Sequence, residues 1–112
     1  MKAKNQISSE ALLALVQGAL EDLKGQDIVV LDVRKRCSFT DFMVISSGTS
    51  DRHVRAQAEK VTEKAKEVGV RPLGVEDSRE GGWVLVDLVD VVVHVMRPEV
   101  RQFYNLEKLW AV

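Results

Sequence analysis

The residues best able to do chemistry lie in one short turn, Gly48-Thr49-Ser50, directly before a stretch with helical periodicity. Backbone N–H groups at the start of a helix, together with the positive end of the helix dipole, commonly form a phosphate or anion site. The turn lacks the lysine and the spacing of a P-loop, and the chain contains no Gly-x-Gly-x-x-Gly segment. A nucleotide-binding or nucleotidyl-transfer site at this turn therefore remains an alternative to a simple helix start.

Catalysis at such a site would also need carboxylates that hold a metal ion, and the sequence offers few of them. Asp87 and Asp90 lie near opposite ends of one turn, and no Asp-x-Asp pair occurs elsewhere. His53 and His94 are far apart in the sequence, neither has a second ligand at helical spacing, and Cys37 is the only cysteine. We therefore expect no catalytic residue, no metal centre and no cofactor, and a binding module rather than an enzyme.

Length and composition predict a single domain, residues 1–112, with one hydrophobic core. Sixteen basic and seventeen acidic residues leave a net charge of −1, unlike the strongly basic domains that bind nucleic acid. No apolar run reaches the roughly 20 residues of a membrane span, and the first residues lack the apolar core of a signal peptide. We expect a cytoplasmic protein with no membrane segment and no base-specific nucleic-acid recognition.

The segment 81–96 is the best candidate for a β-hairpin, because two short runs of β-branched residues flank a turn. With Leu88 and Val89 as the tip, Val86 lies opposite Val91, and successive residues alternate between the two faces. One face then consists of valines alone. The other face carries Trp83, Leu85, Asp87, Asp90, Val92, His94 and Met96. This mixed face is either a working surface or a second core surface that lies under a helix.

The charge around this hairpin is uneven. Between Glu76 and Asp90 there are five acidic residues and a single arginine, a segment charge of −4. Such a surface repels phosphate and attracts a basic protein, although an acidic loop that is merely solvated gives the same pattern.

Hydrophobic periodicity predicts two long helices. The first begins after Ser8 and ends before Gly25, which takes the position of a left-handed stop. The second has Ser50 or Thr49 as its N-cap and ends at Gly69. Its apolar stripe consists of Val54, Ala58, Val61, Ala65 and Val68.

Further strands are predicted at 28–31, 41–46 and 71–75. The first is apolar without alternation and is expected to be a central strand covered on both faces. The loop to the second is too short for a crossover, so these two strands should be antiparallel. The helix after the second strand then makes a β-α-β unit with the third, and Pro72 places that third strand at a sheet edge or a strand start. Residues 76–82 are expected to form a loop.

Pro98 marks the first turn of a C-terminal helix. Leu106, Leu109 and Trp110 are expected to dock the tail, with most of the C-terminal aromatic mass in the core. Together these elements predict an α/β fold: a five-stranded mixed sheet with flanking helices.

Several segments between Leu20 and Trp110 form a specific combination. They are Asp41-Phe42-Met43-Val44-Ile45, Ser47-Gly48-Thr49-Ser50 with His53-Val54, Pro72-Leu73-Gly74-Val75-Glu76, Trp83-Val84-Leu85-Val86-Asp87, Asp90-Val91-Val92-Val93-His94-Val95-Met96, and Arg101-Gln102-Phe103-Tyr104 with Leu106-Glu107-Lys108-Leu109-Trp110. This combination resembles the ribosomal silencing factor family, also called RsfS or Iojap-like. The resemblance implies a fold similar to nucleotidyltransferases but without their catalytic carboxylates.

The resemblance also implies a partner. Members of the family bind the large ribosomal subunit through its universal protein number fourteen, block joining of the small subunit and repress translation under nutrient limitation. They are often homodimers when free. For this chain it predicts a basic ribosomal protein at the mixed face, with Trp83 as the binding hot spot. The apolar flank would be Leu88 and Met96, and the steering acids Glu76, Asp87 and Asp90.

Two positions depart from the family pattern. The family usually has glycine where this chain has Val89, and it usually has glycine after the glutamate where this chain has Asp77. Because valine strongly disfavours a positive φ, we expect the hairpin tip to use another turn or a longer loop.

Overall fold

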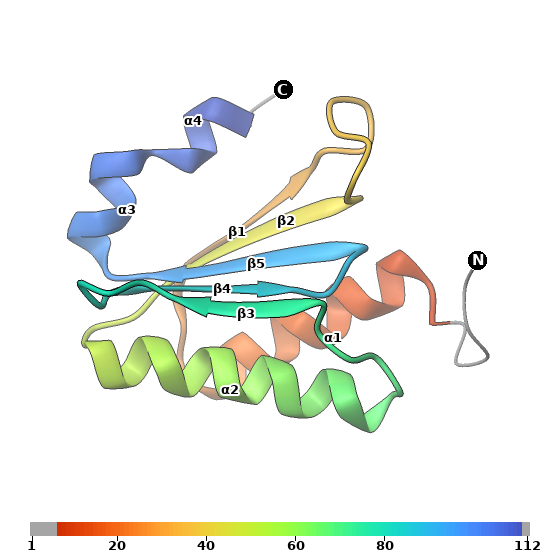
Figure 1. Ribbon diagram of the computed structural model, residues 1–112, viewed down its shortest axis with the longest axis horizontal. Coiled ribbons are helices and arrows are strands. Elements are labelled where there is room, and N and C mark those ends of the chain that lie inside the picture. Colours follow the sequence, from red (N-terminus) through yellow and green to blue (C-terminus); the bar gives the residue numbers. More distant parts are fainter. Residues whose placement is uncertain (1–6, 111–112) are drawn as a thin grey trace.

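The computed structural model describes residues 7–110. Two helices, α1 (Ser9–Asp22) and α2 (Asp51–Glu67), lie on one side of a sheet, and two short helices, α3 (Pro98–Tyr104) and α4 (Leu106–Trp110), lie on the other (Figure 1). The strands are β1 (Gln26–Asp32), β2 (Phe42–Ser47), β3 (Gly74–Asp77), β4 (Trp83–Asp87) and β5 (Val91–Met96).

The sheet has five strands in the order β1-β2-β5-β4-β3. β5 lies at its centre and runs parallel to β2, whereas β1 with β2, β5 with β4, and β4 with β3 are antiparallel. The predicted mixed five-stranded sheet is therefore confirmed, as are the antiparallel first pair and the edge position of β3. The crossover from β2 through α2 to β3 passes over two intervening strands.

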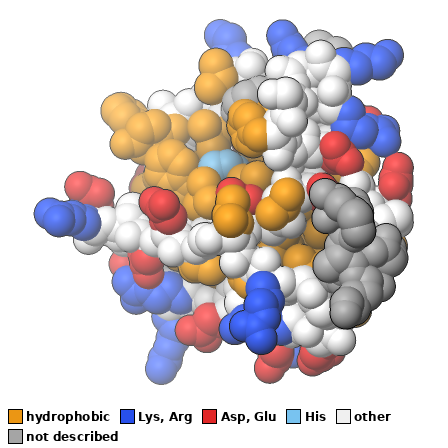
Figure 2. Space-filling view, turned by 45° about the vertical axis from the view of Figure 1, so that its right-hand side comes forward, with side chains coloured by type: hydrophobic (Ala, Val, Ile, Leu, Met, Phe, Trp, Pro, Cys, Tyr) orange, Lys and Arg blue, Asp and Glu red, His pale blue; other side chains and the backbone are white. Residues whose placement is uncertain are grey.

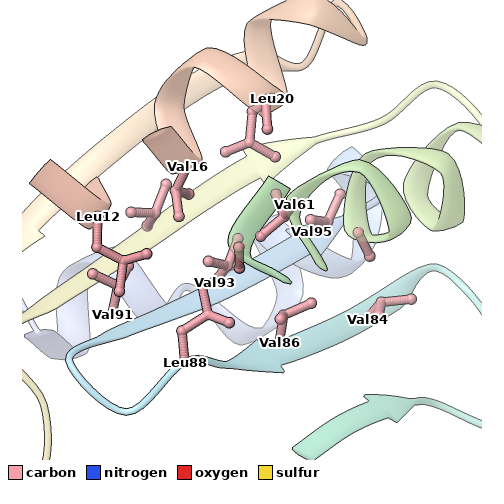
Figure 3. Close-up of a cluster of buried hydrophobic side chains, with 14 of the residues drawn as sticks. Leu12, Val16, Leu20, Val61, Val84, Val86, Leu88, Val91, Val93 and Val95 are labelled. Atoms are coloured by element: carbon pink, nitrogen blue, oxygen red, sulfur yellow. The ribbon is translucent and has the colours of Figure 1, made fainter. Parts of the chain in front are cut away.

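The main core lies between the sheet and the two long helices (Figure 3). The valine face of the hairpin supplies its floor, and the predicted apolar stripe of α2 is buried from Val54 to Ala65. The labelled core side chains are Leu12, Val16, Leu20, Val61, Val84, Val86, Leu88, Val91, Val93 and Val95. Ser8 and Ser50 cap α1 and α2 by accepting hydrogen bonds from the N–H groups of Ala11 and His53.

The prediction that the strand at 28–31 is central is wrong, because β1 is an edge strand. Its residues are half-buried or exposed, with Ile28 and Val30 packed against the core. An apolar run without alternation is thus compatible with an edge strand when α1 covers one face and the other face is only partly covered.

Three boundaries also differ from the sequence predictions. The third strand begins at Gly74 and includes Glu76 and Asp77, which were expected in a loop. After α1 the left-handed position is taken by Lys24, whose φ is 60°, and not by Gly25. Glycine at position 25 serves close packing, since an added Cβ would lie 2.5 Å from side-chain oxygens of Ser46 and Gln57.

The β4–β5 hairpin has the predicted faces but another register. Val86 pairs with Val93, and not with Val91 as predicted. A shift by an even number of residues keeps each side chain on its predicted face. The separation into a valine face and a mixed face therefore holds although the predicted pairing is wrong.

The hairpin tip contradicts the expectation for Val89, whose φ is 73°. The N–H of Asp90 donates to the carbonyl of Leu88 across it, the hydrogen-bond pattern of a γ-turn with a positive central φ, which is a strained conformation. Asp87 Oδ1 accepts from the Val89 N–H at 2.9 Å and helps to hold the turn. The turn is therefore tight, and its strain lies in Val89.

The C-terminal tail is more exposed than the sequence suggested. Phe103 and Leu109 are 79% and 68% exposed, so neither belongs to the core. The prediction for the side chain of Trp110 lies outside the part of the chain that the structure describes. What anchors the tail is instead Arg101, which is buried.

Candidate partner-binding surface

The sheet face opposite α1 and α2, here called the open face, contains the predicted site. It is formed by alternate residues of the strands: Met43 and Ile45 of β2, Val92, His94 and Met96 of β5, Trp83, Leu85 and Asp87 of β4, and Glu76 of β3. α3 and α4 lie over one end of this face (Figure 1). Figure 2 shows hydrophobic side chains gathered on the same upper side of the molecule, with acidic side chains beside them.

Trp83 is half-buried at the border of the open face, between β5 and α3. Its indole Nε1 donates a hydrogen bond to Nδ1 of His94 at 3.1 Å, and its ring contacts that of Tyr104 with centroids 4.8 Å apart. Tyr104 in turn packs edge-on against Phe103. Three aromatic rings therefore form one continuous cluster that reaches from the sheet to the exposed side of α3.

His94 lies beneath this cluster and is 6% exposed. Burial lowers the pKa of His94 from 6.5 to about 4, because the charged imidazolium would lose its hydration. The ring is therefore neutral at physiological pH, as an acceptor for the Trp83 N–H must be. His94 supports Trp83 from below and is not itself exposed enough to bind a partner.

The two residues predicted as the apolar flank are placed differently by the structure. Leu88 is 2% exposed and points into the core on the helix side, and Met96 is fully buried beneath the open face. Neither reaches the surface in this structure. Leu85, which was predicted on the mixed face but not as a partner-binding residue, is half-buried beside His94. Together with the exposed Tyr104 it supplies apolar surface.

The sequence contained an indication that the aromatic pair on α3 would not be fully buried. Phe103 and Tyr104 are adjacent, and neighbouring helical residues point about 100° apart, so one short helix does not bury both against the same surface. The sequence prediction placed them in the core because aromatic side chains are usually buried there.

The predicted acids lie around the rim. Glu76 is exposed on β3, directly opposite Leu85 of β4. Asp87 is half-buried at the end of β4, and Asp90 is half-buried in the tip, where its carbonyl accepts from the N–H groups of Asp41 and Phe42. Glu76 and Asp87 thus border the open face on the β3 and β4 side.

Arg101 fixes α3 and α4 to the sheet. Its Nη1 donates to Ser47 Oγ at 2.7 Å, at the end of β2, and its Nε donates to Glu107 Oε1 at 2.8 Å. The Arg101 guanidinium in turn holds the pKa of Glu107 below its usual range. One buried cation thereby sets the position of the helix that carries Tyr104.

The Gly48-Thr49-Ser50 turn uses several of its polar groups in hydrogen bonds within the chain. The N–H of Gly48 donates to the carbonyl of Met96, and the N–H of Thr49 donates to Nδ1 of His53. Ser50 Oγ caps α2, and the carboxylate of Asp51 already lies at the same helix end. These contacts explain the turn as a helix start and place a negative charge where an anion would bind.

Within residues 7–110 no three His, Cys, Asp or Glu side chains lie close enough together to hold a metal ion. None of the helices in that range is long and apolar enough to cross a membrane.

Comparison with known proteins agrees with the sequence resemblance. A family model described as "Ribosomal silencing factor during starvation" matches residues 6–112. The ribosomal silencing factor RsfS of Chromobacterium violaceum is 51% identical over 92 residues, 82% of this chain and 75% of that protein, and the RsfS of Haemophilus influenzae is 43% identical over 101 residues, 90% and 99%. A crystal structure of a Chromobacterium violaceum protein, 46% identical, matches 93% of this chain and 87% of its own with a TM-score of 0.90. This chain belongs to the ribosomal silencing factor family.

Proposed function

We propose that this chain binds the large ribosomal subunit through its open face, with the universal subunit-interface protein number fourteen as the direct contact. Bound there, it blocks joining of the small subunit and represses translation under nutrient limitation in the cytoplasm. The free chain forms a homodimer. Family membership supports a role in ribosomal silencing, and the surface described above supports the mode of binding.

The observation that carries the proposal is the aromatic cluster beside the open face. Binding hot spots are enriched in tryptophan, tyrosine and arginine, and a side chain that is already held in its bound conformation loses less entropy on binding. Trp83 is held by His94 on one side and by Tyr104 on the other, so its indole is preorganised. Tyr104 extends the same apolar surface to solvent.

Charge gives this surface its preference for a basic partner. Glu76 and Asp87 border it, and no lysine or arginine side chain lies on the open-face positions of β4 and β5. Acidic residues at the rim of an interface accelerate association with a basic protein and discourage direct contact with RNA phosphates.

A nucleotide-dependent enzyme is the rival function, and we propose that this chain is not one. The N–H groups of Gly48 and Thr49 donate to acceptors within the fold, and the carboxylate of Asp51, which is paired with Arg97 at 3.5 Å, already occupies the start of α2. Calorimetric titration with ATP and GTP in the presence of magnesium should give no binding. Micromolar affinity that Ser50→Ala abolishes would replace our proposal with the rival.

The central test is co-sedimentation of the protein with purified large subunits. Trp83→Ala should weaken binding by about 2 kcal/mol, roughly thirtyfold, while circular dichroism shows that the domain remains folded. Glu21→Lys, an exposed change on α1 at the opposite side of the sheet, serves as the control and should bind normally. Normal binding by folded Trp83→Ala would show that the partner uses another surface.

Three further measurements address the finer parts of the proposal. Formation of joined ribosomes from purified subunits should fall with added wild-type protein and recover with Trp83→Ala. Isolated large-subunit protein number fourteen should retain wild type on a column and not retain Trp83→Ala. Sedimentation equilibrium of the free protein should give twice the monomer mass, and a monomer at all concentrations would remove the homodimer from the proposal.

A further inference from the structure

A groove runs between α2 and the edge strand β3, on the side of the sheet opposite the open face. Its volume is about 670 Å³, and its floor is largely apolar, formed by Ala58, Thr62 and Val84. Val75 of β3 forms one wall and is 52% exposed. The groove is therefore a partly apolar surface bordered by a strand and a helix.

The backbone of β3 is unpaired on the side away from β4. The N–H of Ser78 donates to the carbonyl of Trp83, which makes these two a hydrogen-bonded pair of the antiparallel ladder. Because such pairs alternate, Glu76 also bonds to β4, and the N–H and C=O groups of Val75 and Asp77 point outward. No strand within residues 7–110 lies beyond β3.

This edge lacks several devices that usually prevent strand pairing. Natural edge strands are often protected by lysine, by proline or by a bulge. β3 reads Gly-Val-Glu-Asp: it has no lysine, no proline and no register shift in its ladder with β4, and its protection lies in its short length of four residues and its two acidic side chains. Its charged residues, Glu76 and Asp77, are both carboxylates, so pairing of two copies of β3 would bring like charges close together. The edge therefore disfavours its own copy and favours a basic strand.

The opposite wall of the groove is acidic as well. Glu59, Glu63 and Glu67 follow one another at steps of four along α2 and so lie on one face of the helix. Glu63 and Glu67 make only long ion pairs of 3.6 and 3.7 Å with neighbouring lysines, and Glu59 makes none with a described residue. At one end Arg55 forms an ion pair with Asp77 at 2.9 Å, and Lys66 of α2 also lines the groove. The charged lining residues, three glutamates and Asp77 against Arg55 and Lys66, therefore sum to −2.

We infer that β3 accepts an extended segment of a partner protein as a sixth strand. The side chains of this segment on the α2 side are apolar where they meet Val75 and Ala58, and lysine or arginine where they meet the glutamates of α2. Strand addition of this kind takes its affinity from the backbone and its specificity from alternate side chains. The inference concerns a second surface, and it does not depend on large-subunit binding through the open face.

The test uses two synthetic nine-residue peptides, Val-Thr-Lys-Thr-Val-Thr-Lys-Thr-Val and the same sequence with glutamate in place of lysine, each labelled for fluorescence anisotropy. Because every second residue of a strand lies on the same face, the valines and the lysines or glutamates of each peptide share one face. The lysine peptide should bind at least about tenfold more tightly than the glutamate peptide, a difference that shrinks in salt. On binding, the amide hydrogens of Val75 and Asp77 should exchange more slowly with solvent. Equal binding of the two peptides, or binding of neither, would overturn the inference.

Matched variants separate strand pairing from attraction by charge. Val75→Pro removes one outward N–H without touching the β4 ladder and should weaken lysine-peptide binding about tenfold, whereas Val75→Thr should bind almost as wild type. Replacing Glu59, Glu63 and Glu67 together by lysine should reverse the preference between the peptides. These variants leave Trp83 intact, so large-subunit binding should be unchanged.

Three outcomes would refute strand addition. The first is folded Val75→Pro that binds the lysine peptide as well as wild type does. The second is a triple-lysine variant that keeps the original preference. The third is a dimer that forms in the absence of peptide and dissociates when Val75 is replaced by proline. Such a dimer would show that the β3 edge binds a second copy of the chain.

Discussion

The indole Nε1–H of Trp83 donates to Nδ1 of His94, and this contact selects the neutral imidazole whose proton is on Nε2. Protonation of Nδ1 would set two N–H groups against each other. The proposed hot spot of the surface is thereby joined to a buried titratable group whose pKa is about 4.

The stability of the fold should depend on this group in mildly acidic solution. Because the pKa of His94 is lowered on folding, the unfolded chain binds the proton more readily between about pH 6.5 and pH 4. Above pH 6.5 neutral His94 makes its full contribution to the free energy of unfolding. This contribution is lost as the pH falls, and the loss reaches about 3 kcal/mol near pH 4. Urea unfolding of wild type and His94→Gln at pH 7.5, 5.5 and 4.5 measures it. Equal pH dependence in the two proteins would contradict the assignment, since glutamine does not titrate.

Val89→Gly should stabilise the domain. The valine holds a φ of 73°, a strained conformation for a β-branched residue, and glycine adopts it without cost. After subtraction of the extra backbone entropy of unfolded glycine, the expected gain is about 1 kcal/mol. Thermal or urea unfolding measures the gain, with Val89→Ala as the control that keeps a Cβ and should not be stabilised equally. A loss of stability in Val89→Gly would show that the turn is not strained.

Arg101→Ala should loosen α3 and α4 more than it unfolds the sheet. The substitution removes the hydrogen bonds to Ser47 and Glu107, and we expect a loss of about 2 kcal/mol. This value is below that of a fully buried pair because the Glu107 side chain is 34% exposed. Urea unfolding gives the total, and amide exchange in α3 compared with β5 shows whether the effect is local. Arg79→Ala, an exposed arginine, is the control and should change neither.

Val61→Asp should abolish folding. Val61 is fully buried between α2 and the sheet, and a carboxylate there without a partner costs several kcal/mol, on the order of the whole stability of a small domain. Circular dichroism of the purified variant is the measurement. Glu63→Asp introduces the same side chain on the exposed face of α2 and should fold normally. A folded Val61→Asp with wild-type stability would contradict the described core.

The sequence predicted the fold best where a hydrophobic pattern was compatible with only one secondary structure. The stripe from Val54 to Ala65 predicted the buried face of α2, and alternation along β4 and β5 predicted both faces of the hairpin. Register and strand order depend on tertiary contacts that no local pattern contains. For that reason β1 was expected at the centre, and the pairing of Val86 was wrong by two residues.

The site was predictable in part for the same reason. Alternation placed Trp83 and Asp87 together on one sheet face, which the structure shows to be the open face, and charge counting identified the acidic residues beside it. Leu88 was assigned to the surface because a hairpin tip is usually exposed, but the tight turn around Val89 directs the Leu88 side chain back into the core. The exposure of Tyr104 depends on the position of α3. That position is set by the hydrogen bond from Arg101 to Ser47, two residues that are far apart in the sequence.

The central position of β5 has a consequence for how the protein folds. Phe42 of β2 pairs with Val91 of β5, about fifty residues later, so the two halves of the sheet are joined only by a strand from near the end of the chain. Such distant pairing is slow, since much of the chain must be ordered before the contact forms. During synthesis β2 can pair with β1 and α2 can pack on α1, but the surfaces of β2 and α2 that contact β5 stay exposed until β5 has left the ribosome. The newly made chain is therefore exposed to aggregation until its last strand is inserted.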